Sequence, residues 1–196
     1  MMTLEIFAAL CSFALVSSIT PGPNNLMLMA SGVNFGLRRT LPHLLGVALG
    51  FTAMVALVGA GVTRAFDAIP ALETALRVGC LAYILWMAWK LVRTAGLAEA
   101  GRAASPMTFL QAAGFQWVNP KAWAMALTAV TAYAPDRTLA AVGIVAVVFG
   151  MVNLPSIMVW VLMGLRLRGW LAIPGRLRVF NVTMAVLLVG SVFPML

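Results

Sequence analysis

The sequence predicts an all-α integral membrane protein, with six transmembrane helices arranged as two inverted three-helix repeats and with broken helices in spans one and four. Hydrophobic residues make up 63% of the 196 residues and charged residues only 9%, whereas soluble domains carry about 25% charged residues. Uncharged stretches of membrane length also recur along the chain. The two stretches that proline interrupts occupy corresponding places in the two halves.

Each predicted span is an apolar stretch close to the roughly 20 residues that cross a bilayer. The six stretches are residues 4–37, 40–63, 72–92, 108–134, 138–165 and 179–196. A polar linker over residues 93–107 separates them into two groups of three. We therefore expect one membrane domain, with a first repeat over residues 1–95, a cytoplasmic linker over 96–107 and a second repeat over 108–196.

Two short sequences interrupt spans one and four: Thr20-Pro21-Gly22-Pro23-Asn24-Asn25 and Asn119-Pro120-Lys121. In each, a residue that can cap a helix precedes a proline. Proline suits the first helical position because the amide proton that it lacks would be unpaired there. Each interruption is therefore predicted to end one half-helix and begin another. Corresponding breaks in two halves of a membrane protein indicate the binding site of a transporter.

The basic residues predict the orientation. Most of the 13 lysines and arginines lie in or beside the loops that follow spans one, three and five: Arg38, Arg39, Lys90, Arg93, Arg102, Arg166, Arg168, Arg176 and Arg178. Cytoplasmic loops are rich in Lys and Arg, so both termini are predicted to lie outside. Because three spans is an odd number, the second half enters the membrane from the opposite side. The net charge of +8 then reflects loops near anionic lipid, and no nucleic acid is expected as a partner.

Lys121 is predicted to lie near the middle of span four, where a lysine costs about 2.5–3.5 kcal/mol on insertion scales. Two interpretations stay open: Lys121 caps carbonyls left free by Pro120, or it contacts a ligand. The other strongly polar residues at depth are Asn24, Asn25, Gln116, Asn119 and Asn153. Hydrogen bonds between helices would explain any one of them. All five, together with two helix breaks, favour a polar site.

A set of residues spread over the chain carries a family resemblance: Ile19-Thr20-Pro21-Gly22-Pro23-Asn24, Gly36, Arg38, the stretch 79–89, Trp117-Val118-Asn119-Pro120-Lys121-Ala122 and Phe180-Asn181. With these residues the chain resembles the LysE/RhtB family of amino-acid exporters. The resemblance implies export of amino acids or related small metabolites across the bacterial inner membrane, by proton antiport. We expect a transporter rather than an enzyme, with a small-molecule substrate and the lipid bilayer as partners and with no cofactor or metal. A homodimer is compatible with the sequence.

The expected mechanism is alternating access around a midplane site. Half-helices beginning at Pro21 and Pro120 would present free amides and positive dipole ends to a carboxylate. The candidate substrate-binding residues are Pro21, Gly22, Pro23, Asn24, Asn25, Gln116, Asn119, Pro120, Lys121 and Asn153. Three residues are candidates for proton coupling, namely Lys121, Glu73 and His43, and the sequence leaves the choice among them open.

Two other classes of protein share a three-plus-three layout. A membrane thiol or electron carrier needs cysteines at equivalent positions of the two halves, and Cys11 and Cys80 have no such counterparts. A metal-ion exporter or a membrane enzyme needs clustered His, Cys, Asp or Glu. The sequence has one histidine and no carboxylate predicted at mid-span, which disfavours both.

Overall fold

The computed structural model describes residues 3–61, 71–93, 105–134 and 138–190, and within these ranges the chain is helical and contains no β-strand. The helices in chain order are α1 (Leu4–Ile19), α2 (Pro23–Phe35), α3 (Leu37–Gly59), α5 (Ala71–Val92), α7 (Phe109–Val118), α8 (Pro120–Tyr133), α9 (Leu139–Arg168), the short 3-10 helix η1 (Trp170–Ala172) and α10 (Pro174–Gly190). The predicted all-α class is confirmed for these residues.

Among the described residues, α3 and α9 are long and apolar enough to cross a bilayer. α1 and α2 meet the same criterion as a pair, and they are bent by 56° at the break between them. The broken first span therefore has the form that the sequence predicts. The described part of the chain contains two candidate spans, or three with the bent pair, and the six-span layout stays a prediction.

Two predicted boundaries are wrong. The pair Arg38-Arg39 was expected to end span one, but both residues lie in the first turn of α3. Gly36 joins α2 directly to α3 with a φ of 78°, a conformation that glycine adopts readily, so no loop is needed. The last helix begins at Pro174 rather than near residue 179, since proline is well accommodated in the first turn of a helix.

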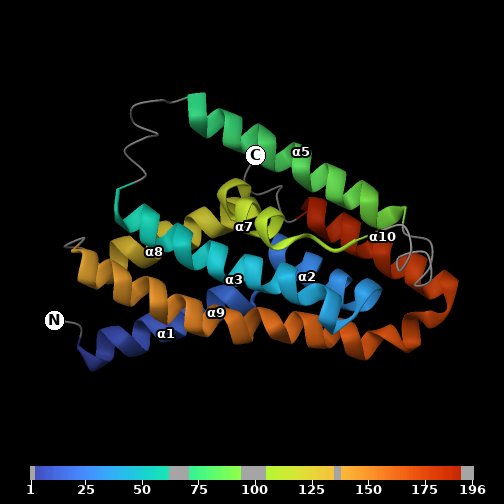
Figure 1. Ribbon diagram of the computed structural model, residues 1–196, viewed down its shortest axis with the longest axis horizontal. Coiled ribbons are helices and arrows are strands. Elements are labelled where there is room, and N and C mark those ends of the chain that lie inside the picture. Colours follow the sequence, from blue (N-terminus) through green and yellow to red (C-terminus); the bar gives the residue numbers. More distant parts are fainter. Residues whose placement is uncertain (1–2, 62–70, 94–104, 135–137, 191–196) are drawn as a thin grey trace.

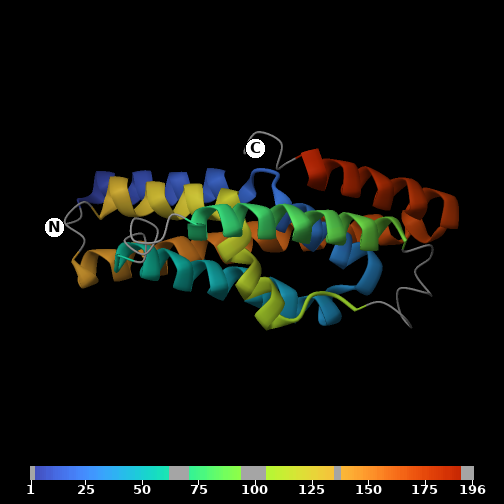
Figure 2. The ribbon, with the colours of Figure 1, turned by 90° about the horizontal axis from the view of Figure 1, so that it is seen from above.

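Helix α9 packs against α1, α2 and α3, while α7 lies against α3 and α10 lies beside α5 (Figure 1). In Figure 1, α1 and α2 run away from the end that holds the N-terminus, whereas α8 runs back toward it. α3 and α9 also run in opposite directions, as do α5 and α10. Figure 2 shows the change of direction between α7 and α8. The corresponding pairs α2 and α8, α3 and α9, and α5 and α10 are thus oppositely directed.

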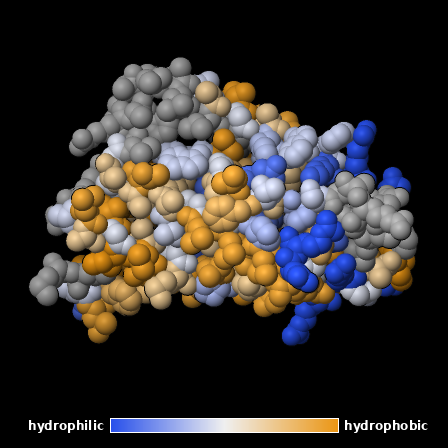
Figure 3. All heavy atoms as spheres, in the orientation of Figure 1, coloured by the Kyte–Doolittle hydropathy of each residue, from blue (hydrophilic) through white to orange (hydrophobic). Residues whose placement is uncertain are grey.

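One end of the molecule is hydrophilic, while hydrophobic residues cover much of the rest of the same face (Figure 3). At this end α2 passes into α3, α9 ends and α10 begins. We call it the basic end, after its exposed arginines: Arg38, Arg39, Arg166, Arg176 and Arg178. Exposed leucines and valines lie along α3 and α9 away from it. This distribution suits a chain embedded in lipid whose basic end meets an aqueous, anionic surface.

Glycines allow two pairs of helices to approach closely. A Cβ atom added at Gly32 of α2 would lie 2.6 Å from the carbonyl oxygen of Val161 in α9. A Cβ atom at Gly50 of α3 would lie 2.5 Å from the Cα atom of Ala113 in α7, and Gly46 meets the same helix. In the sequence, the small-xxx-small spacing of Gly46 and Gly50 predicts a face for close helix packing. This face is present, and it brings α7 against α3.

Replacing Gly50 with alanine is expected to lower stability, because the new methyl group would meet the backbone of α7. Overpacking of this kind costs about 1–3 kcal/mol. Gly143→Ala is the matched control, since no atom lies within 4 Å of the added Cβ atom. The control variant should be as stable as the original chain or slightly more stable, because alanine favours helix. Thermal unfolding of both variants in detergent measures the difference, and equal melting temperatures would contradict the tight α3–α7 contact.

Candidate functional site

The first break separates α1 from α2 by three residues, of which Thr20 and Gly22 have extended conformations. Thr20 is the C-cap of α1, and Gly22, with φ −175° and ψ 176°, is the N-cap of α2. The prediction that Thr20 caps the second half-helix and that Pro21 begins it is wrong. The second proline of the motif, Pro23, occupies the first helical position instead. Pro21 is left in the link between the two helices.

The second break is a single residue. Asn119 ends α7 and caps α8, since its side-chain Oδ1 accepts a hydrogen bond of 3.1 Å from the backbone N–H of Lys121. Pro120 follows at the first helical position. Here the predicted cap and proline are both confirmed. The two breaks therefore differ: α8 has a side-chain cap, whereas α2 begins at a glycine that supplies none.

Lys121 reaches from the second break to the first. Its Nζ atom donates to the backbone oxygen of Thr20 at 2.7 Å and lies 2.9 Å from Thr20 Oγ1 and 3.4 Å from the backbone oxygen of Pro21. The lysine does cap carbonyls, but they belong to the end of α1 and not to the turn before Pro120. A positive charge at this position also complements the negative end of the α1 dipole.

Two further side chains donate hydrogen bonds to carbonyls at the end of α1. Asn25 Nδ2 donates to the oxygens of Ser18 and Thr20, each at 2.8 Å. Trp160 Nε1, from α9, donates to the oxygen of Ile19 at 3.1 Å. A helix end in a membrane cannot rely on water for these groups. The break is therefore held open by donors from α2, α8 and α9.

A pocket of about 340 Å³ lies at the meeting of the two breaks. Its polar lining comes from Ser17, Ser18, Gly22, Asn24, Asn25, Asn119, Lys121 and Asn153. Its apolar lining comes from Val47, Phe51, Ala122, Met125 and Ile157. The fold thus brings residues of α1, α2, α3, α8 and α9 to one cavity, and most of the predicted binding residues are among them.

Three amide side chains at the site, those of Asn24, Gln116 and Asn153, differ in their hydrogen bonding. Asn24 and Gln116 bond each other twice, with Asn24 Nδ2 donating at 2.8 Å and Gln116 Nε2 donating at 3.3 Å. Asn153 donates to Ser18 Oγ at 3.0 Å, but its own Oδ1 atom is buried without a hydrogen-bond partner. The buried acceptor of Asn153 leaves the pocket able to accept a hydrogen bond from a ligand.

Gly22 leaves room for the side chain of Lys121. A Cβ atom at residue 22 would lie 2.7 Å from Lys121 Cδ and 3.2 Å from Nζ. The glycine therefore lets the lysine side chain lie across the first break. This contact gives the Pro-Gly-Pro sequence a physical reason beyond the turn itself.

One of the predicted coupling residues, His43, lies away from this pocket. It is buried in α3 and lines a different cavity. Glu73 belongs to α5, and its side chain falls outside the described residues. Within the described ranges, no group of three or more His, Cys, Asp and Glu residues is placed to hold a metal ion. Of Lys121 and His43, the fold brings Lys121 to the pocket.

Sequence reasoning did not identify Ser18 or Trp160 as parts of the site, and it gave Thr20 only a capping role. Ser18 could have been found, since hydroxyl residues shortly before a proline break lie among the carbonyls that the break exposes. Trp160 gives no such signal, because a tryptophan within an apolar stretch is ordinarily a packing residue. Its role depends on the way α9 passes the end of α1.

A helical membrane chain with a polar pocket at paired helix breaks has the architecture of a secondary transporter. Comparison with known proteins agrees, because the family model LysE type translocator matches residues 15–193. The chain belongs to this family, and it is a membrane transporter rather than an enzyme. This assignment disfavours the thiol-carrier and metal-exporter alternatives.

The relatives include the cysteine/O-acetylserine efflux proteins of Escherichia coli strain K12 and Shigella sonnei. Each is 32% identical to this chain over 166 residues, which are 83% of this chain and 84% of the relative. The protein of the same name from Escherichia coli O1:K1 is 31% identical over the same length. No solved structure matches the chain.

Replacing Asn25 with leucine is expected to destabilise the protein by about 1–3 kcal/mol, because the carbonyls of Ser18 and Thr20 would lose a buried donor. Ser12→Ala is the control. Ser12 donates to the oxygen of Ala8 within α1, where the backbone ladder already supplies a partner. Thermal unfolding in detergent should separate the two variants. If Asn25→Leu and Ser12→Ala have the same melting temperature, the end of α1 does not depend on this asparagine.

Proposed function

We propose that the protein exports amino acids or related small metabolites across the inner membrane, by alternating access around the pocket at the two helix breaks. The observation that carries the proposal is the pairing of an uncapped half-helix start at Gly22 with the ammonium of Lys121. An uncapped helix start and a lysine together favour a carboxylate. The side chains of Asn24, Asn119 and Asn153 would orient the other polar groups of the substrate.

The substrate carboxylate would compete with the end of α1 for Lys121. In the structure the ammonium donates to Thr20. A carboxylate placed against the start of α2 would offer Lys121 a stronger, charged partner. Loss of the lysine from Thr20 would then loosen the link between the two breaks. Substrate binding and movement of one half against the other would in this way share one side chain.

The names of the relatives suggest the substrate class. Cysteine and O-acetylserine are small amino acids with short side chains, and relatives that cover most of this chain are named for their efflux. A pocket with several polar side chains and one apolar wall has the chemistry to hold a small amino acid. We therefore propose small, polar or sulfur-bearing amino acids as the exported compounds.

Opposite helix directions support the proposed six-span inverted repeat. α2 and α8 run in opposite directions, and so do the pairs α3 and α9 and α5 and α10 (Figure 1). The basic end then faces the cytoplasm, and both termini lie outside. Proton antiport belongs to the same proposal. Its three candidates are still Lys121, His43 and Glu73, of which Lys121 sits where substrate and proton could exchange directly.

The export assay uses a host sensitised to dipeptides, whose hydrolysis loads the cell with amino acids. Expression of this chain is expected to restore growth on dipeptides of the exported amino acid and to release that amino acid into the medium. Export would be contradicted if growth is restored without release of the amino acid, or if the chain neither restores growth nor causes release.

Lys121→Gln is expected to weaken substrate binding by about 2–5 kcal/mol, as when a buried charge pair loses one partner. The loss should be confined to substrates with a carboxylate, so an amidated analogue should bind the variant and the original chain alike. If Lys121 also carries the proton, pH-driven flux should vanish while substrate exchange persists. Arg178→Gln, which removes an exposed charge at the basic end, is the control. Unchanged binding together with unchanged flux would leave Lys121 with the structural role alone.

Reporter fusions test the proposed topology. Fusions after residues 36, 100 and 172 should report the cytoplasm, and fusions near residues 67 and 136 should report the outside. The reason is the concentration of basic residues on one side of the predicted spans. A cytoplasmic signal at residue 136 would remove the inverted repeat.

A further inference from the structure

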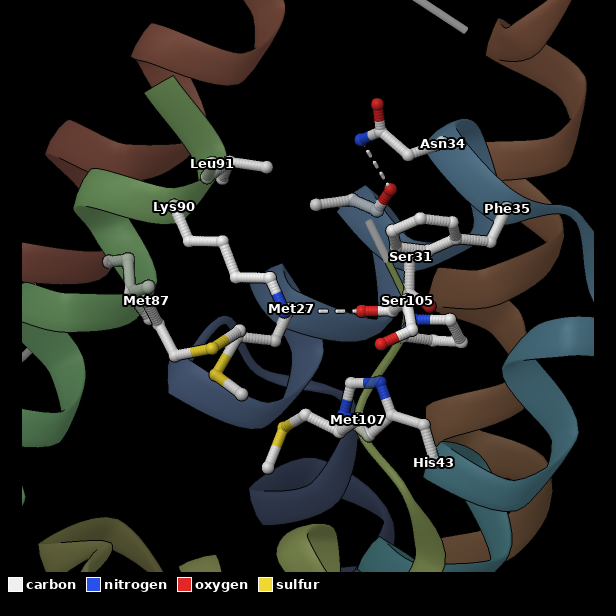
Figure 4. Close-up of a pocket in the computed structure, with 13 residues that line it drawn as sticks. Met27, Ser31, Asn34, Phe35, His43, Met87, Lys90, Leu91, Ser105 and Met107 are labelled. Carbon is white, nitrogen blue, oxygen red and sulfur yellow. Dashed lines mark hydrogen bonds between the residues drawn. The ribbon is translucent and has the colours of Figure 1, made fainter. Parts of the chain in front are cut away.

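A second cavity, of about 520 Å³, lies between α2, α3, α5 and the segment that precedes α7 (Figure 4). None of its lining residues lines the pocket at the breaks. Along α2, the pocket at the breaks is lined by Asn24 and Asn25, whereas the second cavity is lined by residues between Met27 and Phe35. This second cavity is therefore a separate place, on the side of the basic end.

The cavity contains buried polar atoms that have no partner. His43 is 1% exposed, and neither of its ring nitrogens makes a hydrogen bond. Figure 4 shows the imidazole directed from α3 into the cavity. Asn34, which is 2% exposed, has an unpartnered Oδ1 atom in the same lining. A neutral imidazole carries one donor and one acceptor, and burying both unsatisfied is costly. The unpaired ring nitrogens of His43 therefore indicate that the cavity holds a molecule able to form hydrogen bonds with them.

A positively charged side chain, that of Lys90, reaches into the cavity from the wall opposite His43. Lys90 extends from α5 toward the centre of Figure 4, and its Nζ atom donates to the oxygen of Ser105 at 3.3 Å. The same Nζ atom lies 5.3 Å from the centroid of the Trp86 ring. Its positive charge would attract a carboxylate. Between His43 and Lys90 the cavity is lined by the thioether side chains of Met27, Met87 and Met107. Methionine side chains are flexible and polarizable, and they adapt to small or sulfur-bearing groups.

We propose that this cavity is a second amino-acid site, at which the exported molecule is first bound on its way from the basic end to the pocket at the breaks. Lys90 would hold the carboxylate, His43 would accept from the amino group, and the three methionines would surround the side chain. The proposal rests on the proposed function, because it names a loading site for the same substrate. Helix α2 would connect the two sites along the transport path.

The test is equilibrium binding of radiolabelled, reduced L-cysteine to the full chain in lipid nanodiscs. The original chain should bind two molecules. Lys90→Gln should lower affinity at one site by tenfold or more and leave the other unchanged, and His43→Phe should do the same. Arg93→Gln is the matched control: it removes a charge three residues further along the chain, where Arg93 is exposed and stacks on Trp89. This variant should retain both sites. If His43→Phe does not fold, the result for Lys90→Gln decides the test.

The outcomes separate the two proposals. Export by the original chain with only one bound molecule, unaffected by Lys90→Gln and His43→Phe, would overturn the loading site and leave the pocket at the breaks in place. The second cavity would then hold water only. Absence of both export and binding in the original chain would overturn the proposed function and the loading site together. Two bound molecules, one of them sensitive to Lys90→Gln and not to Arg93→Gln, would support the loading site.

Discussion

The contact between the Lys121 ammonium and the end of α1 is the interaction on which the rest of the site depends. A break in a membrane helix exposes carbonyls that lipid cannot satisfy, so the chain must supply the donors. Lys121 supplies two of these contacts from α8, while Asn25 and Trp160 supply the others from α2 and α9. A lysine that would be costly at this depth is therefore stabilised by the same carbonyls that the first break leaves unpaired.

This arrangement connects the two halves at their breaks. Gly22 leaves room for the lysine, and α2 begins without a side-chain cap beside it. The carbonyls of Thr20 and Pro21 attract the ammonium of Lys121. The start of α2 favours an anion. One pocket could therefore hold both a carboxylate and the lysine. A substrate that displaces Thr20 from Lys121 would release one half from the other. Under the proposed function, structural capping and ligand contact would be two states of one side chain rather than alternatives.

The sequence predicted the features that follow from local chemistry. The helical class, the broken first span, the cap at Asn119 and the close face at Gly46 and Gly50 all depend on residues near one another in the chain. The start of α2 was misplaced because two prolines competed for the first helical position, and Pro23 occupies it. The partner of Lys121 could not be predicted, because the contact spans the two halves and depends on tertiary packing. The role of Trp160 was hidden for the same reason.

The most direct test of the central claim is export by the double variant Pro21→Ala, Pro23→Ala. Alanine favours helix and restores the amide that proline lacks, so one continuous helix should form through residues 18–30. The carbonyls of Thr20 and Pro21 that contact Lys121 would then bond within that helix. The account predicts that the variant reaches the membrane in normal amount and loses export. Full export by the double variant would contradict it, since the break would then be a feature of packing alone.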